Sequence, residues 1–76
     1  MKNNLKEIEI NKSFIKLGEF LKLACVCATG GEAKLLIINS KVKLNGEICT
    51  MRGKKLTGGD IVSVNNMEYM VKYEAN

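Results

Sequence analysis

The amino-acid sequence predicts an α+β domain, with two short helices packed on a small antiparallel sheet of about three to five strands. Two observations carry this prediction. Residues 29–46 show a helical apolar period and then an alternating one, and residues 47–73 contain short alternating runs separated by turn residues. With 76 residues, the chain is expected to form a single domain over residues 1–76, with a core between about residues 5 and 73.

The second helix has the clearest local signals. Thr29 and Glu32 form a Thr-x-x-Glu capping box at its start. Ala33, Leu36 and Ile37 then make one apolar stripe along a helix. The helix is expected to end near residues 39–40, because these two polar side chains compete for backbone hydrogen bonds.

A short strand is predicted after this helix. Val42 and Leu44 point to one side of it, and Lys41 and Lys43 point to the other. Asn45-Gly46 is a strong turn signal, because both residues tolerate positive φ. The strand is therefore expected to present an apolar face to the core and a basic face to a partner.

The other elements rest on weaker patterns. Residues 5–10 alternate in part and predict a strand, after which Asn11 or Ser13 is expected to cap a first helix. The apolar face of that helix is predicted to comprise Phe14, Leu17, Leu21 and Ala24, with Phe20 at its edge. The C-terminal part predicts a short strand at 47–50, a basic loop at 51–55, a turn at 56–60, and a hairpin with strands at 61–64 and 67–73.

Composition argues against catalysis and metal binding. The chain has no histidine, the side chain best suited to acid–base work near neutral pH. Its three cysteines show no metal-site spacing and favour a reducing compartment, and Cys25 and Cys27 are predicted to be small buried hydrophobes. We expect no enzymatic activity, no metal, no cofactor and no small-molecule substrate.

The sequence also predicts a cytoplasmic protein without a membrane partner. Charged residues at positions 6, 7 and 9 interrupt the apolar segment that a signal peptide would need. The longest apolar run, residues 23–28, is far too short to span a bilayer.

Positive charge is concentrated in the middle of the chain. The formal net charge is +4, from 12 basic and 8 acidic residues, and residues 41–55 contain Glu47 as their single acid beside five basic side chains. Such a cluster is the expected footprint of a site for a polyanion. A solvated face that keeps the protein soluble explains the charge alone equally well.

The candidate nucleic-acid contacts combine basic side chains with a glycine pair. Gly30 and Gly31 open the second helix, where free N–H groups favour a phosphate. The alternative is that the two glycines permit a sharp turn between the helices. The basic side chains expected to form one continuous surface are Lys34, Lys41, Lys43, Arg52, Lys54 and Lys55. Few aromatic residues are available to stack on bases, which favours structured RNA over unpaired bases.

These residues resemble the RNA-binding domain named after ribosomal small-subunit protein four, also called the αL motif. Its pattern has a basic residue, Leu-Asp and a Leu three positions on, and then Ser-Arg-x-x-Ala-x-x-Leu-Ile, Gly and Val-x-Val-Asn-Gly. The matching residues here are Lys16, Leu17, Leu21, Thr29, Ala33, Leu36, Ile37, Val42, Leu44, Asn45 and Gly46, with Gly59-Asp60-Ile61 at a later turn. The T-G-G-E-A-K and R-G-K-K-L stretches are most similar to small stand-alone bacterial proteins of the YaaA/YbcJ type.

The resemblance implies non-catalytic binding of structured RNA, either ribosomal RNA or a ribosomal particle, with a role in ribosome assembly. It adds Lys16 and Asn45 to the expected RNA contacts. An alternative function is a protein-interaction module that uses the basic patch or a free sheet edge near residues 67–73. A third is homodimerisation through exposed apolar residues.

Four departures from the family pattern bear on the expected contacts. Lys16 replaces an arginine, Gly18 an aspartate, Gly30 a second arginine and Ser40 a glycine. An arginine binds a phosphate with two parallel hydrogen bonds, which lysine does not reproduce. The departures therefore bear on the RNA contacts more than on the fold.

Overall fold

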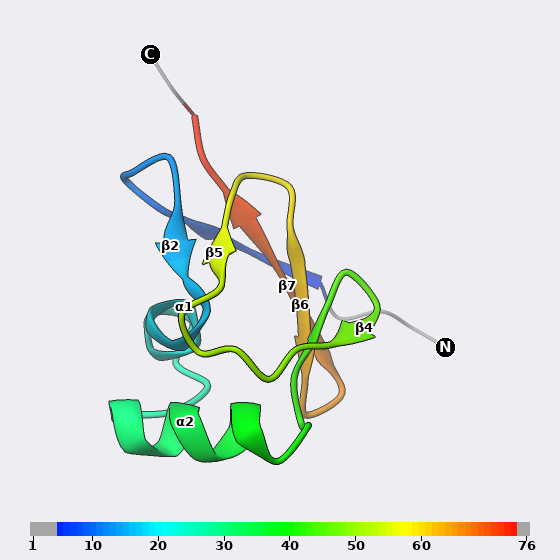
Figure 1. Cartoon of the computed structure of the whole chain (residues 1–76). Helices are drawn as coiled ribbons and strands as arrows, with labels where there is room; N and C mark the ends of the chain where they lie inside the picture. Colours follow the sequence, from blue (N-terminus) through cyan, green and yellow to red (C-terminus); the bar gives the residue numbers. More distant parts are fainter. Residues whose placement is uncertain (1–4, 75–76) are drawn as a thin grey trace.

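A computed structural model describes residues 5–74 and confirms the α+β class with two helices (Figure 1). The elements run in the order β1 (Leu5–Glu9), β2 (Ile15–Lys16), α1 (Leu17–Leu23), α2 (Gly30–Ile38), β3 (Lys43–Leu44), β4 (Glu47–Ile48), β5 (Lys55–Leu56), β6 (Ile61–Val64) and β7 (Met67–Lys72). Five strands form the main sheet in the order β1-β7-β6-β3-β4, and β2 pairs with β5 in a separate two-stranded ribbon. The ribbon was not predicted.

The main sheet is mixed, whereas the sequence predicted an antiparallel one. β1 runs parallel to β7, and the other pairs in this sheet are antiparallel. Because β7 lies between β1 and β6, the predicted free edge near residues 67–73 is wrong. The edges of the sheet are β1 and the two-residue strand β4.

Two hairpin turns were predicted correctly from their residues. Asn45 and Gly46 join β3 to β4 with φ values of 52° and 91°. Asn65 and Asn66 join β6 to β7 with φ values of 55° and 64°. Positive φ at both central positions matches the right-handed twist of the flanking strands, which explains why these dipeptides form tight hairpins.

One face of the main sheet packs on the helices. Val62, Tyr69 and Val71 are buried on this face, in one core with Phe20 of α1 and Ile37 of α2. The strand register places a different set of residues on the opposite face, because directly paired residues share a side. One row across this open face consists of Leu5, Glu68, Ser63, Lys43 and Ile48.

Helix α1 begins later than predicted. Its first residue is Leu17, and neither Asn11 nor Ser13 caps it. The N–H group of Leu17 instead donates to the carbonyl oxygen of Lys54 at 2.8 Å. Phe14 lies outside the helix and is 38% exposed, while Phe20, predicted at the edge, is completely buried.

Helix α2 has the predicted capping box, with one variation. The Thr29 hydroxyl accepts a hydrogen bond from the N–H of Glu32 at 3.2 Å. The Glu32 carboxylate accepts from the N–H of Ala28 at 2.8 Å, one residue before the usual position. Ala33 and Ile37 are buried and Leu36 is partly buried, so the predicted stripe does face the core.

Both helices end in the same backbone motif. Cys25 follows α1 with φ 62°, and Ser40 follows α2 with φ 61°. The next residue in each case donates its N–H to a carbonyl in the last turn, from Val26 to Leu21 and from Lys41 to Leu36. This is the Schellman motif, in which the left-handed position usually belongs to glycine. Cys25 is exposed at this position, so its predicted burial is wrong, while Cys27 is partly buried against the core.

Candidate nucleic-acid interface

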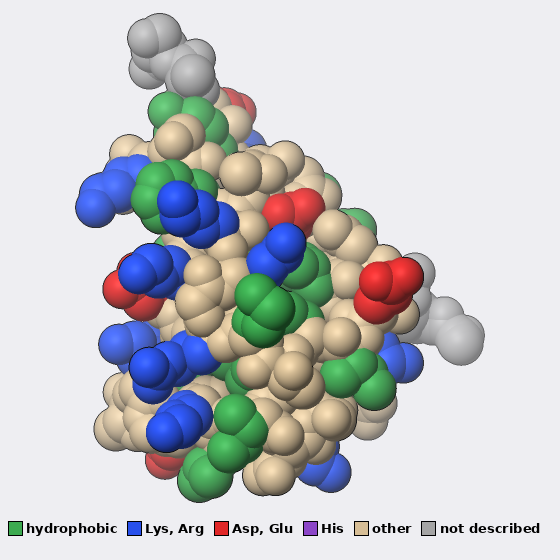
Figure 2. Space-filling model, in the orientation of Figure 1, with side chains coloured by type: hydrophobic (Ala, Val, Ile, Leu, Met, Phe, Trp, Pro, Cys, Tyr) green, Lys and Arg blue, Asp and Glu red, His purple; other side chains and the backbone are tan. Residues whose placement is uncertain are grey.

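A shallow depression lies where α1, the start of α2 and the loop before β5 meet, and we call it the basic groove. Lys16 and Arg52 come to it from separate elements, and Gly30 contributes the first turn of α2. The residues that line it are Lys16, Gly18, Glu19, Lys22, Gly30, Ala33, Arg52 and Gly53. Lys and Arg side chains gather over this part of the molecule, along the left of Figure 2. The groove therefore unites three of the predicted contact residues, Lys16, Gly30 and Arg52, and adds Lys22, which is not among them.

Two lysines face each other across the β2–β5 ribbon. Lys16 pairs directly with Lys55, and opposed like charges destabilise a strand pair. The Lys55 Nζ lies 4.7 Å from the centre of the Phe14 ring. This cation–π contact stabilises the position of the Lys55 ammonium group. Within residues 5–74, Lys72 is the single cation in an ion pair, so no described carboxylate neutralises the ribbon lysines. An external anion would relieve this repulsion.

A second depression adjoins the ribbon. It is lined by Leu44, Asn45, Glu47, Lys54, Lys55, Thr57 and Asp60. The Asn45 amide is already bonded within the protein: its nitrogen donates to Asp60 at 3.1 Å, and its oxygen accepts from the N–H of Ile61 at 2.9 Å. Asp60 also accepts from the N–H of Thr57 at 2.8 Å. Asn45 thus links the β3–β4 turn to the turn before β6. These hydrogen bonds explain the Asn-Gly and Gly-Asp-Ile motifs of the family by a structural role.

The structure does not join all the predicted basic residues into one surface. Lys34 lies one helical turn after Gly30, on the same face of α2, and so extends the basic groove. Lys41 comes after the other end of α2, about 13 Å away along a nine-residue helix. Lys43 is on the open face of the sheet, in the row with Ser63 and Glu68. The alternation in this strand was predicted correctly, but its basic face looks away from the groove.

The first turn of α2 leaves backbone donors available. Thr29 satisfies the N–H of Glu32, and no described residue accepts from the N–H groups of Gly30 and Gly31. Neither glycine has a positive φ, so a sharp turn does not explain them. A Cβ added at Gly30 would meet nothing within 4 Å. The fold therefore does not require glycine at this position, where alanine would favour the helix.

The surroundings of Cys27 disfavour its thiolate form. Burial raises the pKa of the Cys27 thiol, and the Glu32 carboxylate raises it further, against a smaller opposing effect of Lys22. A raised pKa keeps the thiol protonated and unreactive at neutral pH. All three cysteines are free.

Neither helix among residues 5–74 has the length and apolar character of a membrane span.

The fold and the groove together define a small α+β module with a surface suited to an anion. The family model for the S4 domain matches residues 8–72, and the chain belongs to the S4 domain family. This confirms the resemblance found in the sequence.

A curated relative and a solved structure add detail. The chain is 44% identical over 57 residues to the probable ribosome maturation protein RlbA of Bacillus subtilis strain 168, covering 75% of this chain and 80% of that protein. The crystal structure of the 30S ribosomal protein S4e from Thermoplasma acidophilum matches with a TM-score of 0.63 and 21% identity. That match covers 83% of this chain but only 33% of S4e, so the chain corresponds to about a third of that protein and shares its fold there.

Proposed function

We propose that the protein is a non-catalytic, cytoplasmic RNA-binding module that recognises structured RNA through the basic groove. The observation that carries the proposal is the direct pairing of Lys16 with Lys55, which no described carboxylate neutralises. Lys16 lines the groove with Arg52 and the open first turn of α2, and Lys55 lines the adjoining depression. Arranging like charges together costs stability, and a phosphate backbone offsets that cost. Lys54 extends the contact into the second depression, and Lys34 extends it along α2.

We further propose that the RNA is ribosomal and that the protein acts during ribosome assembly. Membership of the S4 domain family and the similarity to a probable ribosome maturation protein support this step. The small number of aromatic residues, two tyrosines and two phenylalanines, favours recognition of RNA shape and phosphates over base stacking.

Two charge-reversal variants test which surface binds. Lys16→Glu with Arg52→Glu changes the groove, and Lys41→Glu with Lys43→Glu changes the total charge equally at sites outside it. Binding of a fluorescent structured fragment of ribosomal RNA is measured by anisotropy across a salt series, with duplex DNA as control. We expect the groove variant to lose about a hundredfold or more in affinity, and the matched variant about tenfold or less.

The salt series also distinguishes RNA binding from protein binding, the alternative function. RNA binding that neutralises phosphates weakens steeply as salt rises. Equal loss in both variants would contradict the groove as the main contact, and equal affinity for duplex DNA would contradict selectivity for RNA. Co-sedimentation with ribosomal subunits then tests the ribosomal assignment.

Protein binding is the second candidate function, favoured by exposed apolar side chains on α2 and in the loop before β5. Leu35 and Ile38 on α2 are 58% and 50% exposed, and Met51, next to Arg52, is 61% exposed. Burial of apolar surface drives protein association and is less sensitive to salt than phosphate contacts are. If no RNA binds at low salt, this candidate becomes the leading one.

A further inference from the structure

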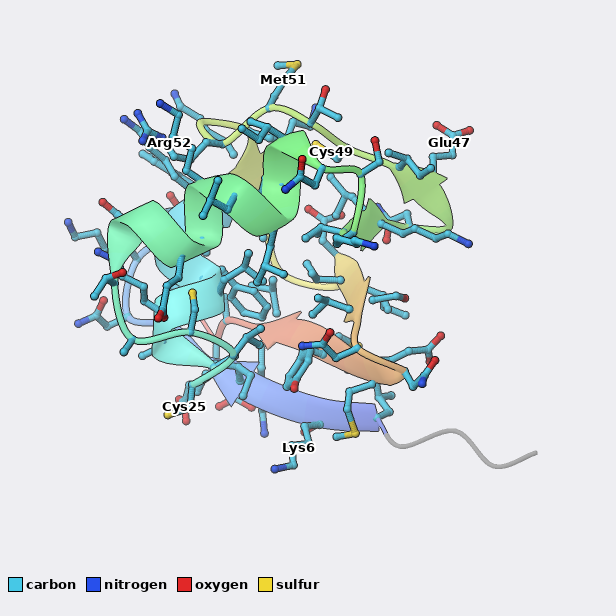
Figure 3. All side chains as sticks on the ribbon, turned by 90° about the horizontal axis from the view of Figure 1, so that it is seen from below. Lys6, Cys25, Glu47, Cys49, Met51 and Arg52 are labelled. Carbon is cyan, nitrogen blue, oxygen red and sulfur yellow. The ribbon has the colours of Figure 1, made fainter. Side chains whose placement is uncertain are left out.

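We infer that Arg52 is the principal phosphate-binding side chain of the basic groove and that Gly18 is the residue that positions it. This inference rests on the RNA binding proposed above. Lysines present a compact point charge, whereas the planar guanidinium of arginine binds a phosphate with two hydrogen bonds. Arg52 is the one arginine of the chain. Figure 3 places its side chain beside the first turn of α2.

Arg52 is held against the start of α1 by both its main chain and its side chain. Its carbonyl oxygen accepts a hydrogen bond from the N–H of Gly18 at 3.1 Å. A Cβ built on Gly18 would lie 2.8 Å from the Cγ of Arg52 and 3.4 Å from its Cδ. The first of these distances is well inside van der Waals contact. The stem of Arg52 therefore occupies the space that a side chain at position 18 would need.

The backbone of Gly18 gives no other reason for a glycine. Its φ is not in the left-handed region, and it lies within the first turn of α1. Within a helix, alanine is favoured over glycine. The close approach of Arg52, and not the path of the main chain, thus explains the glycine.

The groove that Arg52 lines has open space beside Gly30. Gly30 lines the same groove, and a side chain there would meet nothing within 4 Å. The family pattern has larger residues at both positions, while this chain has glycine at both. One glycine makes room for the arginine stem and the other leaves room for what the arginine binds. The arginine of this groove thus comes from the loop before β5 instead of from α2.

A double-mutant cycle tests whether Gly18 acts through Arg52. The proteins are the wild type, Gly18→Ala, Arg52→Ala and the combination, with Arg52→Lys as the conservative variant. We expect Arg52→Ala to weaken binding of the ribosomal RNA fragment about tenfold to a hundredfold, and Arg52→Lys to recover only part of this. Loss of one phosphate contact should also lower the salt slope by about one.

Gly18→Ala is expected to reduce affinity by about tenfold when Arg52 is present and to have no effect when residue 52 is alanine. Circular dichroism and the thermal midpoint establish that each variant is folded. Lys6→Ala is the matched control, since Lys6 also carries one exposed positive charge but lies by β1, away from Arg52 (Figure 3). Its affinity should stay within about twofold of the wild type.

A relocated arginine provides a gain-of-function test. In the Arg52→Ala background, Gly30→Arg is expected to restore most of the lost affinity, because the new side chain has open space in the same groove. Absence of any recovery would contradict the placement of both residues at one phosphate.

The outcomes separate the inference from the proposed function. If the wild type binds RNA but Arg52→Ala behaves like Lys6→Ala, the role of Arg52 is wrong. Additive effects of Gly18→Ala and Arg52→Ala would overturn the positioning role of Gly18. If the wild type binds no RNA at any salt concentration, the proposed function itself fails and this inference fails with it.

Discussion

The two helices begin in opposite ways. At the start of α1, the N–H groups of Leu17 and Gly18 donate to the carbonyl oxygens of Lys54 and Arg52, from a loop far along the chain. At the start of α2, the capping partner is the side chain of Thr29, the residue directly before the helix. The N-terminal N–H groups of α1 are thus bonded by a distant segment. In α2 the N–H of Glu32 is bonded by the neighbouring Thr29, and the N–H groups of the two glycines have no described acceptor.

The difference explains how the two helices are stabilised and what each can do. Helix α1 has seven residues, four of which are buried, whereas α2 has nine, of which two are buried. Helix α1 therefore depends on the core and on the loop that carries Arg52. Helix α2 keeps free donors and an exposed face, which suit a ligand. Helix α1 positions the loop that carries Arg52, and α2 contributes the free N–H groups.

The sharpest way to break this comparison is to remove the core contact of α1. Phe20→Ala is expected to destabilise the fold by about 3–5 kcal/mol, because a completely buried ring is replaced by a cavity. Leu35→Ala on α2 is the control, since Leu35 is 58% exposed and should change the unfolding free energy by less than about 0.5 kcal/mol. Urea unfolding followed by circular dichroism measures both. Similar losses would show that α2 depends on tertiary contacts as much as α1 does.

A smaller effect is expected from the local cap of α2. Thr29→Ala removes the acceptor for the N–H of Glu32 and should cost about 1 kcal/mol of unfolding free energy. Thr29→Ser keeps the hydroxyl and should remain close to the wild type. Thermal unfolding of the two variants gives the comparison. If serine proved as destabilising as alanine, the hydroxyl would not be the stabilising group.

The smallest effects concern the ends that the two helices share. Cys25→Gly and Ser40→Gly each replace a residue held at positive φ, and each should raise the unfolding free energy by up to about 1 kcal/mol. Ser13→Gly, at a residue without positive φ, should give no gain. The midpoints of denaturant unfolding test this, provided that the variants and the wild type have the same m-value. A gain at one helix end but not at the other would mark the two motifs as energetically different.

The elements that the sequence predicted correctly are those specified by neighbouring residues. The capping box of α2 and the Asn45-Gly46 and Asn65-Asn66 turns use side chains and φ preferences within a few positions. The start of α1 was misplaced because its partners are the carbonyl groups of Arg52 and Lys54. No local pattern encodes a bond to a loop so far along the chain.

The same division holds for the candidate site. Alternation predicted correctly that Lys43 points away from the core, but not that this direction leads to the open face of the sheet. No local pattern marks Lys22, because its position in the groove depends on how the loop at Arg52 folds back on α1. The best available signal for the groove was the paired departure at Gly18 and Gly30, whose reason becomes visible only in three dimensions.

The parallel pairing of β1 with β7 constrains how the protein folds as it is made. The β6–β7 hairpin forms from adjacent residues, whereas β1 must wait for a partner that is synthesised after every other described strand. Closing so long a loop slows folding, and an unpaired strand is open to aggregation during the wait. Lys6, Glu7 and Glu9 give β1 charges on both faces, which discourage pairing with other chains. The strand that completes the sheet is thus also equipped to remain soluble on its own during translation.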